Sequence, residues 1–298
     1  MGVIEGPMTG RTVVITGASS GLGLASARAL AAGGATVVML NRDLEKSEVV
    51  IEQLTAETGG SFDLVLVDLA SFDSVRRGAA QLLRRHPAID VLMLNAGIIA
   101  PSRAVTEDGH ELTYQVNHLS HFLLAALVRD ALSARPSGRL ITVSSEAHRQ
   151  AMTLPMHDLD MSGRWAPYRA YAASKLENIL FAREATRRLG PRVTSNALHP
   201  GTVRTAWGLE GRGPAWWIWK TALRPVLSTP ERGADTQVWL ASAPEAALLD
   251  GAYVSGRRPV RPSALGTSES LARQLWEMSE EATGESWPAA RADERALS

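Results

Sequence analysis

The sequence predicts an α/β domain in which a doubly wound parallel sheet is covered by helices on both faces. Short β-branched or aliphatic runs alternate with alanine-rich stretches through most of the 298 residues. This alternation is typical of right-handed crossovers between neighbouring parallel strands. The length suits one large domain, and no internal repeat or low-complexity linker divides residues 1–298. We therefore expect a single domain.

The expected elements follow one another in a regular order. Six runs are predicted to be buried strands: Thr12–Thr16, Thr36–Leu40, Leu64–Asp68, Val91–Asn95, Arg139–Ser145 and Val193–Leu198. Between them, helical spacing of apolar residues marks Leu22–Ala32, Asp73–Arg85, Leu112–Leu132 and Tyr171–Leu189. Residues 205–230, rich in Gly, Pro and Trp, break this rhythm, and residues 288–298 are expected to form a flexible tail.

Composition narrows the classes of protein. The chain is 45% apolar and 21% charged with a formal net charge of zero, which gives no reason to expect a nucleic-acid partner. It has no cysteine, which excludes disulfides and thiolate chemistry. The first residues lack the basic and apolar regions of a signal peptide, and no apolar run is long enough for stable membrane insertion. A cytoplasmic location is expected.

Tyr171 and Lys175 form the most informative pair. The chain has only three lysines, Lys46, Lys175 and Lys220, and uses arginine for its other basic residues. Residues four apart lie on one face of a helix, so this phenol and this ammonium can serve one site. A neighbouring cation is expected to lower the pKa of a tyrosine, and lysine is a compact charge suited to that role.

A glycine-rich turn follows the first predicted strand. Thr16-Gly17-Ala18-Ser19-Ser20-Gly21-Leu22-Gly23 leads directly into a helix. Glycines at such a turn let the backbone approach a pyrophosphate, which the free N–H groups of the helix N-terminus attract. In a chain with alternating strands and helices, the turn predicts a Rossmann-type sheet that binds a dinucleotide.

These motifs together resemble the short-chain dehydrogenase/reductase family. Further landmarks are Asn95-Ala96-Gly97, Asn117 in a long helix, Ser145 at the end of the fifth strand, and Pro200-Gly201 after the sixth. They occur in the family's order over roughly residues 10–260. Three segments, His199–Thr205, Ser144–His148 and Leu275–Glu281, are similar to the retinol-dehydrogenase-like branch.

The resemblance implies a catalytic set of Asn117, Ser145, Tyr171 and Lys175. Tyr171 would give a proton to the carbonyl oxygen, Ser145 would polarise that oxygen, and Lys175 would hold the nicotinamide ribose. Asn117 would position a water in a proton relay. Ser144 and Tyr168 are the competing serine and tyrosine; the turn that follows Ser145 and the spacing to Lys175 favour Ser145 and Tyr171.

The expected cofactor is NADP(H), with NAD disfavoured. Asn41 stands where an acid would bind the adenosine ribose of NAD, and Arg42 follows with a guanidinium suited to a 2′-phosphate. Asp43 is expected to cap the next helix instead. The full set of expected cofactor contacts is Gly17, Ser19, Ser20, Gly21, Leu22, Gly23, Asn41, Arg42, Asp68, Leu69, Asn95, Ala96, Gly97, Tyr171, Lys175, Pro200, Gly201, Val203 and Thr205.

We expect interconversion of a carbonyl and an alcohol on a bulky apolar or aromatic small molecule. The insert at residues 148–168 and a lid at residues 205–230 would form the substrate site, with Ser145, His148, Trp165, Trp207 and Trp216 as contacts. Tryptophans in these segments could instead pack as core or touch a membrane surface. No metal is expected. The alternatives are a non-catalytic nucleotide-binding scaffold or redox sensor, and an epimerase or dehydratase on the same cofactor site. Homo-oligomers are common in this family, so a homo-oligomer is an open expectation.

Overall fold

One predominantly parallel sheet forms the centre of the molecule. The computed structural model describes residue 4, residues 6–201 and residues 229–287. Within these residues, eight strands follow the order β3-β2-β1-β4-β5-β6-β7-β8, and all neighbours are parallel except β7 and β8. The strands are β1 (Thr12–Thr16), β2 (Thr36–Asn41), β3 (Ser61–Leu66), β4 (Val91–Leu94), β5 (Gly138–Val143), β6 (Val193–His199), β7 (Tyr253–Ser255) and β8 (Arg258–Pro259).

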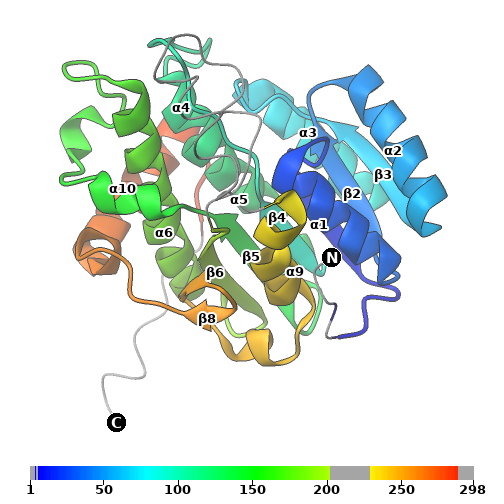
Figure 1. Cartoon of the computed structure of the whole chain (residues 1–298). Helices are drawn as coiled ribbons and strands as arrows, with labels where there is room; N and C mark the ends of the chain where they lie inside the picture. Colours follow the sequence, from blue (N-terminus) through cyan, green and yellow to red (C-terminus); the bar gives the residue numbers. More distant parts are fainter. Residues whose placement is uncertain (1–3, 5, 202–228, 288–298) are drawn as a thin grey trace.

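Helices connect the strands and cover both faces of the sheet (Figure 1). The α-helices are α1 (Gly21–Ala32), α2 (Leu44–Thr58), α3 (Phe72–Arg85), α4 (Leu112–Tyr114), α5 (Ser120–Ser133), α6 (Pro167–Leu189), α8 (Pro230–Gly233), α9 (Asp235–Ser242) and α10 (Glu269–Thr283). A π-turn, η1 (Gln115–Leu119), joins α4 to α5. Short 3-10 turns are η2 (Glu146–Gln150), η3 (Met156–Asp158), η5 (Glu245–Leu248) and η6 (Leu265–Thr267).

Alternate residues of each strand enter two different cores. In β1, Val14 joins the core beneath α3, α5 and α6, whereas Val13 and Ile15 join the core beneath α1, α2 and α9. Side chains of a strand alternate between the two faces of a sheet, so a strand that is apolar throughout must be covered on both sides. This explains why the central strands appear in the sequence as continuous apolar runs.

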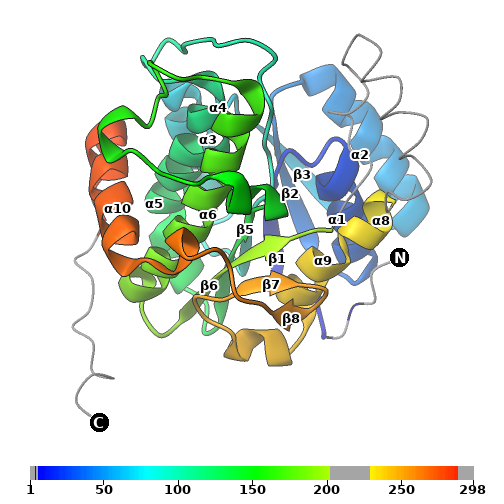
Figure 2. The ribbon, with the colours of Figure 1, turned by 60° about the vertical axis from the view of Figure 1, so that its left-hand side comes forward.

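The C-terminal helix α10 adds a further layer outside α5 and α6 (Figure 2). Trp276 is 1% exposed, and its ring stacks on Phe181 of α6 with centroids 5.5 Å apart. Phe122 of α5 and Trp287 meet the same indole edge-on, at 4.9 and 4.8 Å. Aromatic pairs prefer these offset and edge-to-face geometries. The helix that carries Tyr171 and Lys175 is thus packed from both sides.

The predicted fold class is confirmed, and the boundaries differ in informative places. The helix expected over Leu112–Leu132 is interrupted by the π-turn that contains Asn117. The helix expected from Tyr171 begins earlier, because Pro167 occupies a first-turn position where its missing N–H costs nothing. Strands β7 and β8, which have three and two residues, were not predicted. No described helix is both long and apolar enough to cross a bilayer.

Candidate active site

The turn after β1 has the backbone shape that a pyrophosphate needs. Gly17 and Gly21 have φ of +67° and +56°, a region that favours glycine. At Gly23 a Cβ would lie 2.4 Å from the Gly17 oxygen, so only glycine lets α1 approach the turn this closely. A Cβ at Gly21 would meet open space, which leaves room beside the α1 N-terminus for phosphate oxygens.

Thr16 and Asn95 hold this turn against the loop after β4. The Thr16 hydroxyl oxygen accepts hydrogen bonds from the backbone N–H of Asn95 at 2.9 Å and of Ala96 at 3.0 Å. The Asn95 amide donates in return to the Thr16 carbonyl oxygen at 2.9 Å. Buried polar groups are satisfied in this network, so the two loops form one rigid unit.

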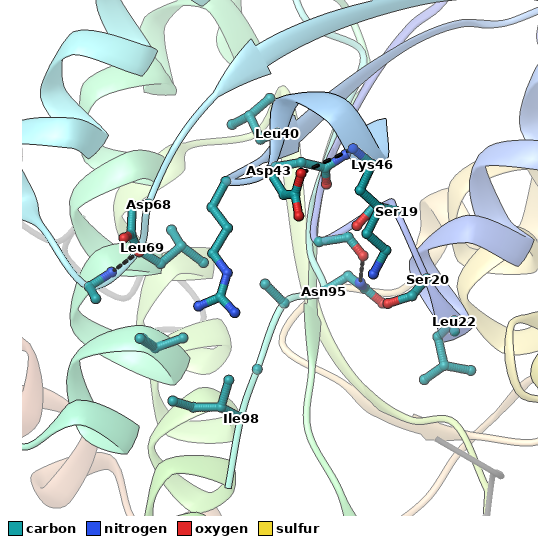
Figure 3. A pocket seen from close by; sticks show the side chains of 18 of the residues that line it. Ser19, Ser20, Leu22, Leu40, Asp43, Lys46, Asp68, Leu69, Asn95 and Ile98 are labelled. Carbon is teal, nitrogen blue, oxygen red and sulfur yellow. Dashed lines mark hydrogen bonds between the residues drawn. The ribbon is translucent and has the colours of Figure 1, made fainter. Parts of the chain in front are cut away.

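A cavity of about 360 Å³ opens at the carboxyl edge of β1, β2 and β4, where ligands bind in open α/β sheets (Figure 3). Its lining includes twelve of the expected cofactor contacts: Gly17, Ser19, Ser20, Gly21, Leu22, Asn41, Arg42, Asp68, Leu69, Asn95, Ala96 and Gly97. Leu40, Asp43, Lys46, Ala70, Ile98, Leu112 and Val116 line it as well. The sequence motifs and the cavity therefore coincide.

The side chains of Asn41 and Asp43 form hydrogen bonds within the protein at the end of β2. Asn41 is 4% exposed; its Oδ1 accepts from the Ala18 N–H at 2.8 Å and its Nδ2 donates to Ser47 at 3.0 Å. The Asp43 carboxylate caps α2, as expected, by accepting from the Lys46 N–H at 3.0 Å. Asn41 has no carboxylate for a ribose diol, and one oxygen of the Asp43 carboxylate is engaged in the helix cap.

Two cations border the same part of the cavity. Arg42 and Lys46 are both exposed, and no described residue forms an ion pair with either side chain. The Lys46 side chain runs along the same wall as Ser19 and Ser20 (Figure 3). Lys46 was missed at the sequence level, although its spacing from Arg42 and the scarcity of lysine were available signals. Cations at the border of a cavity are suited to binding an anionic group such as a phosphate.

Tyr171, Lys175 and Ser145 meet where β5 ends. The Lys175 side chain is 2% exposed, its Nζ donates to the Val143 carbonyl oxygen at 3.0 Å, and it lies 5.5 Å from the centre of the Tyr171 ring. The hydroxyl groups of Ser145 and Tyr171 are hydrogen bonded to each other. The Ser145 oxygen also accepts from the Ala147 N–H at 3.2 Å, which leaves its own hydrogen free to donate.

Burial and contacts distinguish Ser145 from Ser144, and Tyr171 from Tyr168. Ser144 is 1% exposed, and its hydroxyl donates to the Lys175 carbonyl oxygen at 2.6 Å, inside the protein. Tyr168 is 47% exposed, and its ring centre lies 6.2 Å from that of Tyr171. Only Ser145 and Tyr171 contact each other through their hydroxyl groups among these four.

Asn117 lies in the π-turn and joins the loop after β4 to α6. Its Oδ1 accepts from the Ile98 N–H at 2.7 Å, and its Nδ2 donates to the Ile98 carbonyl at 3.0 Å and to Ser174 at 2.9 Å. π-turns within helices frequently occur at functional sites. The Asn117 carbonyl accepts a bond from His121 Nδ1 at 3.1 Å, while the Nε2 of this ring meets the Thr16 hydroxyl at 2.9 Å.

Burial makes both members of the Tyr171–Lys175 pair favour their neutral forms. It raises the pKa of Tyr171 to about 12, although the bond from Ser145 acts in the opposite direction. It lowers the pKa of Lys175 to about 7. The expectation that Lys175 lowers the pKa of Tyr171 is therefore wrong for the protein alone, because desolvation outweighs the cation, which is itself largely discharged above pH 7.

Three of the five expected substrate residues, Ser145, His148 and Trp165, lie within the described residues. His148 is fully buried, with both ring nitrogens bonded to the backbone, so it does not face an open cleft, contrary to expectation. Trp165 is partly buried and donates to Glu111 Oε1 at 3.0 Å. Pro200 and Gly201 follow β6, whereas Val203, Thr205, Trp207 and Trp216 lie outside the described residues. The insert is not a free loop, since Ala151, Leu154 and Leu159 are buried in the main core.

Comparison with known proteins defines the class. The family model for short chain dehydrogenases matches residues 11–210, and the chain belongs to this oxidoreductase family. It lies in the retinol-dehydrogenase-like branch. A Streptomyces protein (strain C5) assigned as the daunorubicin C-13 ketoreductase DnrU is 42% identical over 289 residues, which cover 95% of this chain and 96% of that protein. Human retinol dehydrogenase 13 is 36% identical, with 95% and 87% covered.

Solved structures agree with this assignment. A crystal structure of an uncharacterised protein from Mycobacterium paratuberculosis superposes with a TM-score of 0.79 at 34% identity, covering 97% of this chain and 100% of the other. A blue fluorescent protein from a metagenomic library, solved in complex with NADPH, gives a TM-score of 0.65 at 27% identity, with 84% and 97% covered.

Proposed function

We propose that this oxidoreductase uses NADPH to reduce a carbonyl group on a bulky apolar or aromatic small molecule to an alcohol. Two observations carry the proposal: the Tyr171 hydroxyl is hydrogen bonded to Ser145 with Lys175 beside the Tyr171 ring, and Arg42 and Lys46 border the cavity after β1, β2 and β4. The glycine turn and the α1 N-terminus fit a dinucleotide, and Arg42 and Lys46 fit its 2′-phosphate. When bound, the reduced nicotinamide supplies a hydride to the carbonyl carbon.

Tyr171 and Ser145 act on the carbonyl oxygen. Negative charge develops on this oxygen during reduction, and donors already aimed at it stabilise the transition state. The raised pKa of Tyr171, about 12, keeps its proton on the phenol at neutral pH, ready for transfer to the oxygen. The Ser145 oxygen accepts from the Ala147 N–H, so its hydrogen can turn from the Tyr171 oxygen to the substrate oxygen as a second donor. This protonation state favours reduction over oxidation.

Lys175 and Asn117 organise the base of the site. Lys175 Nζ is held by the Val143 carbonyl within reach of the Tyr171 ring, where it would bind the nicotinamide ribose hydroxyls. An ammonium beside an oxygen that has lost its proton stabilises the anion. Asn117, fixed by Ile98 and Ser174, keeps the β4 loop and α6 at a constant separation. Its role in a proton relay remains a prediction.

The proposed substrate class is supported by the apolar lining of the cavity and by the names of two relatives. The cavity continues along Ile98, Leu112 and Val116, which are apolar side chains. Two relatives are named as a daunorubicin C-13 ketoreductase and a retinol dehydrogenase, so both names refer to carbonyl–alcohol chemistry on an organic small molecule. Apolar walls with a few polar groups are usual in small-molecule sites.

The catalytic proposal is tested by Tyr171→Phe, with Tyr168→Phe as the matched control. NADPH oxidation is followed across a panel of retinoid, steroid, polyketide-like and aromatic carbonyls. We expect Tyr171→Phe to lower kcat at least about 10³-fold while the Kd for NADPH stays within about twofold. Tyr168→Phe should keep most of the activity. Equal turnover by the Tyr171→Phe protein would refute the proposal and favour a binding or sensing role.

The cofactor proposal is tested with Arg42→Gln and Lys46→Gln. Each should lower kcat/KM for NADPH about tenfold, because a charge-assisted bond to phosphate is lost, and leave the value for NADH nearly unchanged. Arg84→Gln makes the same change of net charge at an exposed position of α3 and should alter neither. Similar kcat/KM values of the wild-type protein for NADPH and NADH would contradict the preference.

A further inference from the structure

His148 lies three residues after Ser145 and makes contacts that the mechanism above does not use. Its side chain is fully buried. Nδ1 lies 2.7 Å from the Ser145 carbonyl oxygen, and Nε2 lies 3.0 Å from the backbone nitrogen of Ser263. The backbone N–H of His148 donates to the same Ser145 oxygen at 3.0 Å. One residue thus holds the Ser145 carbonyl with two donors.

The partners of His148 determine which ring nitrogen carries the hydrogen. A carbonyl oxygen only accepts hydrogen bonds, so Nδ1 must donate. A backbone N–H only donates, so Nε2 must accept from Ser263. The imidazole is therefore neutral in a single tautomer, in agreement with burial, which lowers the pKa of His148.

These bonds connect two parts of the chain that are distant in sequence. The Ser145 turn ends β5, whereas Ser263 follows β8 near the C-terminal end. The Tyr253 ring meets the His148 ring edge-on, with centroids 5.0 Å apart, and the Tyr253 hydroxyl donates to Glu146 Oε1 at 3.1 Å. Arg149 also donates to the Arg261 carbonyl at 2.7 Å. Contacts from residues 253–263, called the C-terminal segment below, therefore hold the turn that carries Ser145.

We propose that His148 is a positioning residue for Ser145. By fixing the Ser145 carbonyl, the Nδ1–H bond fixes the backbone from which the Ser145 hydroxyl projects toward Tyr171. The bond from Ser263 fixes the ring itself, so the C-terminal segment contributes to the geometry of the carbonyl site through one imidazole. The proposal rests on the proposed function in assigning Ser145 to catalysis; the contacts themselves do not depend on it.

Two substitutions separate the two ring nitrogens. The amide nitrogen of His148→Asn can occupy the place of Nδ1 and keep the donor to Ser145, whereas the amide oxygen of His148→Gln can reach the place of Nε2 and keep only the link to Ser263. His148→Ala removes both. A misplaced donor at a reacting oxygen costs up to about 10² in rate. We expect kcat to fall about 10- to 100-fold in His148→Gln and His148→Ala, with the Kd for NADPH within about twofold, and to be restored to within about threefold of wild type in His148→Asn.

A second measurement does not require turnover. Tyrosine labelled with ¹³C at Cζ gives four signals, because the chain has four tyrosines, and Tyr171→Phe assigns the relevant one. Ser145→Ala defines its position when the Ser145–Tyr171 bond is absent. We expect His148→Gln and His148→Ala to move the Tyr171 signal toward that position and His148→Asn to leave it near wild type.

The outcomes are distinguishable. If His148→Gln matches the wild type in the Tyr171 signal, or if His148→Asn matches His148→Ala, the positioning role is refuted. If no carbonyl in the panel is reduced by the wild type but the signals move as expected, the proposed function fails while the positioning role stands. Thermal melts of all three variants show that each comparison is made on folded protein.

Discussion

Replacing Lys175 with methionine should stabilise the protein while abolishing its activity. The ammonium is buried, and within the described part of the chain its one hydrogen bond goes to the Val143 carbonyl oxygen. Burial lowers its pKa from 10.5 to about 7. In the unfolded chain the same group keeps its proton up to about pH 10.5, so a positive charge at position 175 favours unfolding at neutral pH.

The size of the effect follows from the two pKa values. Each unit of pKa difference corresponds to about 1.4 kcal/mol, so the folded state is penalised by about 4 kcal/mol at pH 7. Methionine has a similar length but loses the bond to Val143, at a cost of about 1 kcal/mol. Asn178 still donates to that carbonyl at 3.1 Å. The net gain is therefore about 3 kcal/mol at pH 7, or roughly 5 °C in Tm for a chain of 298 residues.

The gain should depend on pH with a defined sign. The folded pKa is depressed, so the wild type becomes more stable as the pH rises from 7 toward 10.5, where the unfolded lysine also loses its proton. The advantage of Lys175→Met should shrink to about 1 kcal/mol at pH 9. Urea unfolding of the cofactor-free protein at both pH values measures it, with exposed Lys46→Met as the control, expected within about 0.5 kcal/mol of wild type.

Either of two results would refute this reasoning. If Lys175→Met is less stable than wild type at pH 7, the packing around the ammonium matters more than its desolvation. If the gain is the same at pH 7 and pH 9, the group does not titrate with the depressed pKa on which the calculation depends.

Three further predictions concern other parts of the molecule. Trp276→Ala should cost about 3–5 kcal/mol in urea unfolding, because a fully buried indole is removed from between Phe181 and Trp287; a loss below 1 kcal/mol would contradict the packing. Gly23→Ala should raise the Kd for NADPH at least about tenfold in calorimetric titration, because the Cβ would lie 2.4 Å from the oxygen of Gly17; unchanged affinity would show that the turn adapts. Burial lowers the pKa of His121 from 6.5 to about 4, so between these pH values the unfolded state binds a proton that the folded state does not. The free energy of unfolding of the wild type should therefore fall by about 3 kcal/mol between pH 6.5 and pH 4 because of this group. His121→Gln should reduce this decline.

Much of the fold could be predicted because the sheet is buried on both faces. Strands such as Val91–Leu94 have no polar residue to make their assignment ambiguous, and the glycine turn fixes where the first helix begins. The π-turn at Asn117 was not predictable from periodicity, since residues 113–126 are all buried and leave no polar face whose shift would reveal the extra residue. β8 was missed because two residues carry no pattern.

The site was predicted less completely than the fold. Helical spacing indicated that Tyr171 and Lys175 share one face, and the family resemblance added Ser145. The protonation of Tyr171 and Lys175 depends on burial, which spacing does not report. His148 was expected to contact the substrate. Its orientation is determined by Ser263, more than a hundred residues later, and no local pattern reveals such a partner.

The late position of α10 in the chain has a consequence for biosynthesis. During translation α5 and α6 leave the ribosome well before Trp276 and Trp287 are made, so Phe122 and Phe181 lack their aromatic partners for that interval. An uncovered apolar face on a partly made chain favours aggregation and chaperone binding. A ribosome-stalled chain ending before residue 269 should therefore be recovered with chaperones more often than one that includes α10.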